Sequence, residues 1–323
     1  MCAILLRNLF AHVSLKVRRR LAGVLAAVAI PPLLTGCSLG SGSASGGPST
    51  PPCPSGQAVI VAAENFWGSI ASQLGGDRVC VRSIIVNPDT DPHAYEAKPS
   101  DARLIAGARY VIVNGAGYDP WVPKLIGANP VSGRVVLTVG DLVGKKEGDN
   151  PHLWYSPGYV ERVVEKINAD LDAIDPRDAA YFDEQKAQYL AVGLRGYLGA
   201  LAAIKQKYHG TPVGATESIF AYVADATGLD LVTPPEYMKA ISEGTDPSAA
   251  DKATIERQIS NRSIKVFVFN SQNSTKDVLA LVDKARAQKI PVVAVTETLS
   301  PAGATFQDWQ TKQLQWLLAA LGG

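Results

Sequence analysis

The feature that most constrains the fold is a long stretch of helical pattern in the middle of the chain. It opens with Asp175-Pro176, a cap and a first-turn proline, and residues 177–208 then contain no proline. About 30 residues at roughly 1.5 Å each give a helix of some 45 Å, long enough to span two domains. We therefore expect one rigid connecting helix, with Gly193, Gly196 and Gly199 forming a smooth face for close packing.

Both halves of the chain alternate strand-like and helical patterns. Short runs rich in β-branched residues occur at 59–63, 81–86, 110–113 and 135–137, and again at 211–215, 266–269 and 291–295. Continuous apolar runs separated by helices indicate parallel strands covered on both faces. The expected fold is α/β, with two lobes at 56–176 and 209–323, each a mainly parallel sheet flanked by helices, joined by a helix at 177–208.

The N-terminal segment has the features of an export signal. Four basic residues precede a short apolar run, Pro31-Pro32 interrupts it, and Leu34-Thr35-Gly36-Cys37 resembles a bacterial lipobox. We expect residues 1–36 to be removed, Cys37 to carry lipid and residues 37–55, rich in Ser, Gly and Pro, to form a tether. An ordinary signal peptide with an incidental cysteine is the alternative.

Charge and cysteine content agree with export. The chain has 31 basic and 30 acidic residues, and residues 1–36 hold five basic and no acidic ones, so the mature part is net negative. This balance argues against a nucleic-acid partner and favours cations. An oxidising compartment would allow Cys53 and Cys80 to pair; two free thiols are the alternative.

Two short segments repeat one pattern. Asp91-Pro92-His93-Ala94-Tyr95 and Asn150-Pro151-His152-Leu153-Trp154 each read as Asx-Pro-His, any residue, then an aromatic, in a chain with only four histidines. Proline restricts the backbone before each imidazole, and an aimed imidazole suits metal coordination. A single such histidine would be interpreted as a turn residue; the matched pair favours coordination. His209, beside the end of the long helix, is not assigned to the site.

These two motifs resemble those of the zinc- and manganese-binding solute receptors of ABC transporters. The resemblance includes Glu96 and Pro99-Ser100-Asp101 after the first motif and covers residues 56–321. It implies two α/β lobes joined by a long helix, an extracytoplasmic lipid-anchored receptor on the cell membrane, an ABC permease as partner and a monomer. It also implies two further ligands from the second lobe, at positions where this chain has Glu217 and Glu297.

The ligand set leaves the cargo open. Two imidazoles and two monodentate carboxylates suit tetrahedral Zn²⁺, whereas bidentate carboxylates suit Mn²⁺ or Fe²⁺. Many relatives carry histidine where this chain has Glu217, and many zinc-binding members have a histidine-rich loop where residues 141–150 have none. These departures lean toward manganese, while the general affinity order favours zinc. The expected cargo is one divalent ion, Zn²⁺ or Mn²⁺.

Two other classes of protein were weighed. A metal-dependent hydrolase needs an open coordination position and a general base, but the chain has no HExxH motif, and Gly115-Ala116-Gly117 lacks the third glycine of a dinucleotide fingerprint. A surface adhesin with a structural metal is the other alternative. Neither explains the paired histidine turns as well as a receptor does, so we expect no enzymatic activity.

Overall fold

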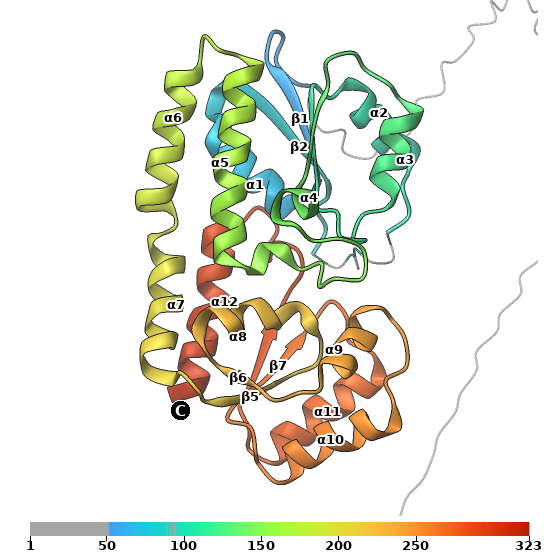
Figure 1. Ribbon diagram of the computed structural model, residues 1–323, viewed down its shortest axis with the longest axis vertical. Helices are drawn as coiled ribbons and strands as arrows, with labels where there is room; N and C mark the ends of the chain where they lie inside the picture. The colour runs from blue at the N-terminus through green and yellow to red at the C-terminus, as the bar shows by residue number, and fades with distance from the viewer. Residues whose placement is uncertain (1–51, 89, 91, 93–94, 323) are drawn as a thin grey trace, which may run out of the picture. The chain divides into compact units, whose positions relative to one another are not determined.

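A computed structural model describes residues 52–88, 90, 92 and 95–322, and within them two parallel sheets are found (Figure 1). The first has the strand order β2-β1-β3-β4 and the second the order β6-β5-β7-β8. All pairings in both sheets are parallel. The predicted α/β class with a mainly parallel sheet in each lobe is confirmed.

The N-terminal lobe is built on the first sheet. Its strands are β1 (Ala58–Glu64), β2 (Val79–Ile85), β3 (Tyr110–Val113) and β4 (Val135–Thr138). Its helices are α1 (Asn65–Gly75), α2 (Pro99–Gly107), α3 (Trp121–Ala128), α4 (Val139–Val143) and α5 (Pro157–Ile174), with short 3-10 turns at Gly76–Arg78 and Leu153–Tyr155.

Helices cover both faces of this sheet because successive strand residues point in opposite directions. Ile60 and Ala62 of β1 belong to the larger hydrophobic core, which includes α1 and α5. Val61 and Ala63 belong to a smaller core with residues of α2 and α3. Complete burial of one such Ile or Val contributes about 1.5–3 kcal/mol, so the apolar runs specify this two-faced packing.

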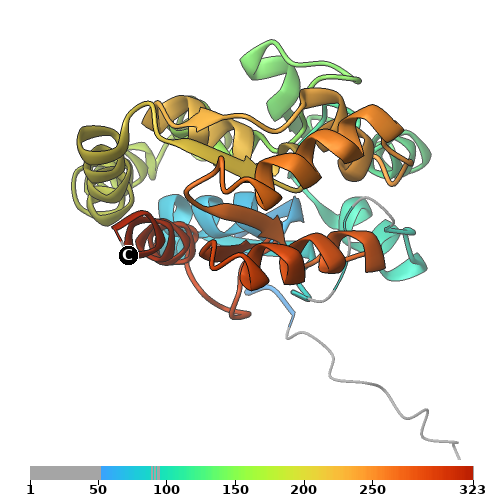
Figure 2. The ribbon, with the colours of Figure 1, turned by 90° about the horizontal axis from the view of Figure 1, so that it is seen from below.

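The connecting helix is present but is not one uninterrupted α-helix. It consists of α6 (Ala179–Gln188), a π-helical turn (Tyr189–Gly193) and α7 (Arg195–Tyr208). It begins at Ala179 rather than at Arg177. Helix α6 packs against α5 and α1, and α7 packs against α8 and α12 (Figures 1 and 2). The π turn therefore lies where the helix passes from one lobe to the other.

The glycines of this helix do not form one smooth face. A Cβ at Gly196 would lie 3.4 Å from Thr311 of α12, so close packing explains this glycine. A Cβ at Gly193 would meet the Tyr189 ring of the π turn at 3.1 Å, and one at Gly199 would have no neighbour within 4 Å. The expectation of three packed glycines is thus wrong for Gly199.

The C-terminal lobe repeats the plan of the first. Its strands are β5 (Pro212–Ala215), β6 (Asp230–Leu231), β7 (Phe267–Asn270) and β8 (Val292–Val295). Its helices are α8 (Ala221–Thr227), α9 (Pro235–Ser242), α10 (Ala249–Ser260), α11 (Lys276–Ala287) and α12 (Phe306–Gly322), with a 3-10 turn at Ser218–Phe220. Helix α12 runs beside α7, as the view from below shows (Figure 2).

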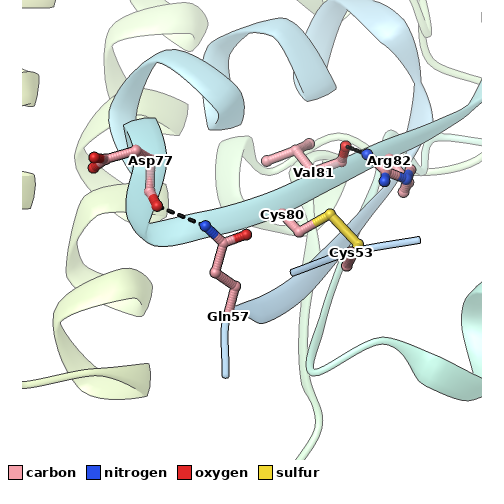
Figure 3. The surroundings of a disulfide bond; sticks show 6 residues. All are labelled: Cys53, Gln57, Asp77, Cys80, Val81 and Arg82. Atoms are coloured by element: carbon pink, nitrogen blue, oxygen red, sulfur yellow. Dashed lines mark hydrogen bonds between the residues drawn. A yellow bond between two sulfur atoms is a disulfide. The ribbon is translucent and has the colours of Figure 1, made fainter. Parts of the chain in front are cut away.

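A disulfide fixes the start of the described chain to the first sheet. Cys53 and Cys80 are bonded, with their Cα atoms 5.7 Å apart, as the cysteine analysis favoured (Figure 3). Close by, the Gln57 side chain donates a hydrogen bond to the Asp77 carbonyl at 2.6 Å. Residues 1–36 and Cys37, to which the signal and the lipid were assigned, lie outside the described residues. Within the described ranges, no helix is long and apolar enough to cross a membrane.

Candidate metal centre

His152 is buried and held by the turn that carries it. It is 0% exposed and caps the 3-10 turn Leu153–Tyr155. The amide nitrogen of Asn150 donates to the Ser218 carbonyl at 2.8 Å, so Asn150 Oδ1 faces the imidazole, with His152 Nδ1 at 2.8 Å. Nδ1 must then carry the proton, which makes Nε2 the nitrogen with a lone pair for a metal ion.

Glu297 lies two residues beyond the end of β8 and is also fully buried. Its Oε1 accepts a hydrogen bond from Asn270 at 2.6 Å, and its Oε2 accepts one from the Tyr118 hydroxyl at 2.6 Å. Asn270 ends β7 in the same lobe, whereas Tyr118 belongs to the N-terminal lobe. Glu297 is therefore held from both lobes.

Glu217 follows the end of β5 and is 0% exposed. Its Oε2 accepts a hydrogen bond at 3.1 Å from Asn273, whose side chain also donates to the Ile241 carbonyl. Both acids thus receive an asparagine amide from the C-terminal end of β7 or just beyond it, Asn270 for Glu297 and Asn273 for Glu217. Hydrogen bonds of this kind fix the orientation of a carboxylate group.

Two tyrosines lie near the predicted ligands. The Tyr118 ring lies 6.2 Å from the His152 ring while its hydroxyl bonds Glu297. Burial, together with the negative charges of Glu297 and Glu217, raises the pKa of Tyr155 well above its usual range. His93, the fourth predicted ligand, lies outside the described residues, and among those described no three His, Cys, Asp or Glu side chains form a metal-ligand cluster.

The turn after β3 is a part of the site that the sequence interpretation missed. Residues 114–119 (hereafter the 114–119 turn) contain three successive positive φ angles, at Gly115, Ala116 and Gly117. A Cβ at Gly115 would lie 2.6 Å from the Thr138 methyl, so glycine is required there. The Asp119 carboxylate closes the turn by accepting the amides of Asn114 at 2.7 Å and Gly115 at 2.8 Å.

This turn contacts both halves of the site. Asn114 donates to the Pro151 carbonyl at 2.9 Å, next to His152, and Tyr118 donates to Glu297. Burial raises the pKa of Asp119 to about 6, although the amides of Gly115 and Asn114 oppose the shift. The sequence contained one indication of this turn, namely its position. The turn follows a buried strand, at the sheet edge where α/β proteins bind ligands.

The remaining polar candidates are placed away from the predicted ligands or have structural roles. Asp101 caps α2, accepting the Lys98 amide at 2.7 Å and the Tyr95 hydroxyl at 2.8 Å. His209 is exposed at the end of α7, and Glu96 is exposed as well. Glu236 and Glu243 line a cavity between the lobes with a volume of about 400 Å³, which also borders Asn150 and Ser218.

Comparison with known proteins shows similarity to metal-binding proteins in both sequence and structure. The sequence profile of the family described as ZnuA, "Zinc-uptake complex component A periplasmic", matches residues 60–320. The zinc-binding lipoprotein AdcA of Streptococcus pneumoniae serotype 4 is 25% identical over 270 residues, covering 76% of this chain and 52% of AdcA. This chain therefore spans about half the length of that relative.

Two other similar proteins extend the comparison. The manganese-binding lipoprotein MntA of Halalkalibacterium halodurans is 26% identical over 228 residues, covering 67% of this chain and 72% of MntA. The solved structure of a Mn-bound periplasmic metal binding protein from Candidatus Liberibacter asiaticus superposes with a TM-score of 0.68 at 20% identity, covering 82% of this chain and 100% of that one. At this identity the structural match shows a shared fold.

Proposed function

Because the chain belongs to the ZnuA family of periplasmic zinc-uptake components, we propose that it is an extracytoplasmic receptor for a divalent transition metal. It would capture one ion between its two lobes and deliver it to an ABC permease for import. Family membership confirms the prediction that the chain is not an enzyme and supports a role as a transport receptor.

One observation carries the proposed location of the ion. The hydroxyl of Tyr118, from the N-terminal lobe, donates to Glu297 of the C-terminal lobe while its ring lies beside His152. Predicted ligands from the two lobes thus share one fully buried neighbourhood. An ion bound there would be coordinated from both lobes and would hold them together.

The proposed ligands are His93, His152, Glu217 and Glu297. His152 would coordinate through Nε2, because its Nδ1 is committed to Asn150. The hydrogen bonds on both oxygens of Glu297 occupy part of its lone-pair capacity and favour coordination through a single oxygen. Two imidazoles with two carboxylates are a donor set that both Zn²⁺ and Mn²⁺ accept.

The cavity between the lobes supports an access route for the ion. Among the residues that line it are four acids and one lysine: Glu147, Asp149, Glu236, Glu243 and Lys239. The excess of negative charge would raise the local concentration of cations. The cavity also borders Asn150 and Ser218, which contact His152, so an ion entering it would be close to the proposed ligands.

The cargo is proposed as Zn²⁺ or Mn²⁺, the ions named for the two relatives. Both relatives are also named lipoproteins, which supports a lipid anchor at Cys37 and a place on the outer face of the cell membrane. The lipobox-like sequence before Cys37 is the residue-level reason for that anchor.

Calorimetric titration of metal-stripped protein with Zn²⁺ and with Mn²⁺ tests the proposal. We expect one ion per chain and saturable binding, lost on substitution of both His93 and His152 by alanine. His209→Ala is the matched control, because this exposed histidine lies outside the proposed ligand set. Equal binding by the double variant and the control would reject the site.

A further inference from the structure

A second pair of acids is buried beside the proposed site and is not among the predicted ligands. Glu64 is the last residue of β1 and is 0% exposed, and Asp119, which closes the 114–119 turn, is 2% exposed. The Glu64 carboxyl group faces that of Asp119 at hydrogen-bonding distance, and no N–H or O–H donor of the other described residues reaches its oxygens. A buried carboxyl group in this setting is costly if it is ionised.

Asp119 has the opposite environment. Both of its oxygens accept backbone amides, from Asn114 and Gly115, which is the pattern expected of a carboxylate. Within the described chain, the charge of Asp119 acts on Glu64, and Glu64 acts on Asp119 through the hydrogen bond between the two side chains. No basic side chain offsets this pair there, so two full negative charges would repel each other in a dry environment.

We propose that Glu64 and Asp119 hold one proton between them, with Glu64 as the neutral acid and Asp119 as the carboxylate, and that this pair positions the metal site. Burial, reinforced by the charge of Asp119, raises the pKa of Glu64 well above its usual range, which agrees with the assignment. The pair would be a positioning element, since neither acid belongs to the proposed ligand set.

The route from this pair to the site is short. Asp119 fixes the backbone of the 114–119 turn. From this turn, Asn114 donates a hydrogen bond to the Pro151 carbonyl, and Tyr118 donates one to Glu297. On the other side, Asn65, next to Glu64, accepts the Leu299 amide at 3.3 Å. Loss of the shared proton would therefore disturb contacts to both lobes at the place where the ion is proposed to bind.

The first test measures the proton and does not depend on metal binding. If Glu64 stays protonated in the folded state and ionises on unfolding, folding takes up a proton. Chemical denaturation of the metal-free full chain and of Glu64→Gln is then compared between about pH 6 and 8. The folding equilibrium constant of the wild type should fall about tenfold per pH unit relative to the variant.

If the ratio of the two folding equilibrium constants, wild type to Glu64→Gln, did not change with pH, Glu64 would be ionised in the folded state. That result would overturn the proposal. If Glu64→Gln does not fold, infrared spectroscopy of the wild type replaces this comparison. A protonated carboxyl stretching band should persist at neutral pH in the metal-free protein. Its absence would equally overturn the shared proton.

The second test measures positioning and rests on the proposed function. Glu64→Gln keeps a neutral hydrogen-bond donor facing Asp119, so its metal affinity should stay within about twofold of the wild type. Glu64→Leu has no donor and should lose about 10–100-fold, the usual range for residues that support ligands. Wild-type affinity in Glu64→Leu would overturn the positioning role.

Asp119→Asn serves the same comparison if Glu64→Leu does not fold. An asparagine has one acceptor oxygen for two backbone amides, so its metal affinity should also fall about 10–100-fold. If the wild type binds neither Zn²⁺ nor Mn²⁺, the proposed function fails while the denaturation test still decides the shared proton. The two failures are thus distinguishable.

Discussion

The two lobes present their proposed ligands in different ways. In the C-terminal lobe, Glu217 and Glu297 each lie two residues beyond a strand end, at Ala215 and Val295. In the N-terminal lobe, His152 lies well beyond the end of β4 at Thr138 and is held by side-chain hydrogen bonds from its own turn. One lobe positions its ligands by the sheet and the other by turns.

This difference has a consequence for stability and for binding. The position of a residue at a strand end is fixed by the packed core, whereas the position of a residue in a turn is fixed by a few hydrogen bonds. The N-terminal half of the site should therefore be more sensitive to the loss of supporting contacts. The predictions below test this contrast, beginning with the largest expected effect on metal affinity.

Removal of a ligand should have the largest effect. We expect His152→Ala to lower metal affinity by at least about 100-fold, because loss of a ligand exceeds the effect of losing a supporting residue. Isothermal titration of the variant, with His209→Ala alongside, measures the loss. Affinity within about twofold of the control would exclude His152 from coordination.

Removal of a supporting asparagine compares the two lobes directly. Asn150→Ala removes the hydrogen bond between Asn150 and His152 Nδ1, and Asn270→Ala removes the hydrogen bond between Asn270 and Glu297. We expect metal affinity to fall near 100-fold in Asn150→Ala and near 10-fold in Asn270→Ala. Both losses lie within the usual range for residues that support ligands. A larger loss in Asn270→Ala would reverse the proposed contrast between turn and sheet.

The stability of the metal-free protein should depend on Asp119 with a defined sign. Its pKa is about 6 in the fold and 3.8 without the fold, so the folded state binds the proton more tightly. This stabilising contribution is complete below about pH 4 and is lost as the pH rises through about 6. Relative to Asp119→Asn, the unfolding free energy of the wild type should fall by roughly 2.5 kcal/mol from about pH 4 to 7.

Denaturant titrations of both proteins across that range measure the difference. A difference that grows with pH would mean that the pKa of Asp119 is lowered in the fold. The contribution of Asp119 to stability would then increase, not decrease, as the pH rises.

The disulfide should have the smallest effect on the metal site. It joins residues 27 apart in sequence, and removing such a link costs about 3–4 kcal/mol of stability in chain-entropy terms. Because it lies at the start of the described chain, away from the proposed ligands, Cys53→Ser with Cys80→Ser should leave metal affinity unchanged. A parallel loss of affinity would mean that the first sheet transmits strain to the site.

Much of the fold followed from local patterns. The β-branched runs predicted both parallel sheets because buried parallel strands are continuously apolar. Asp230–Leu231 was not predicted as a strand, because two residues carry no periodic signal. The π turn at Tyr189–Gly193 was also missed, because it accompanies packing between lobes and leaves no proline or other breaker in the sequence.

The site was predictable only where strand ends or repeated motifs marked it. The resemblance pointed to Glu217 and Glu297, both of which are buried. The ligand roles of His93, His152, Glu217 and Glu297 and the lipidation of Cys37 remain predictions. The role of Tyr118 was not predictable, because its partner Glu297 lies 179 residues away in sequence. Hydrogen bonds between such distant residues depend on the complete tertiary fold.

The central claim is that one ion is held jointly by the two lobes. The most direct measurement is anomalous X-ray diffraction at the zinc and manganese absorption edges from crystals of metal-loaded protein. We predict a single anomalous peak within about 2.0–2.3 Å of both His152 Nε2 and a carboxylate oxygen of Glu297. A peak that contacts residues of only one lobe, or saturable binding with no ion near His152, would contradict the account.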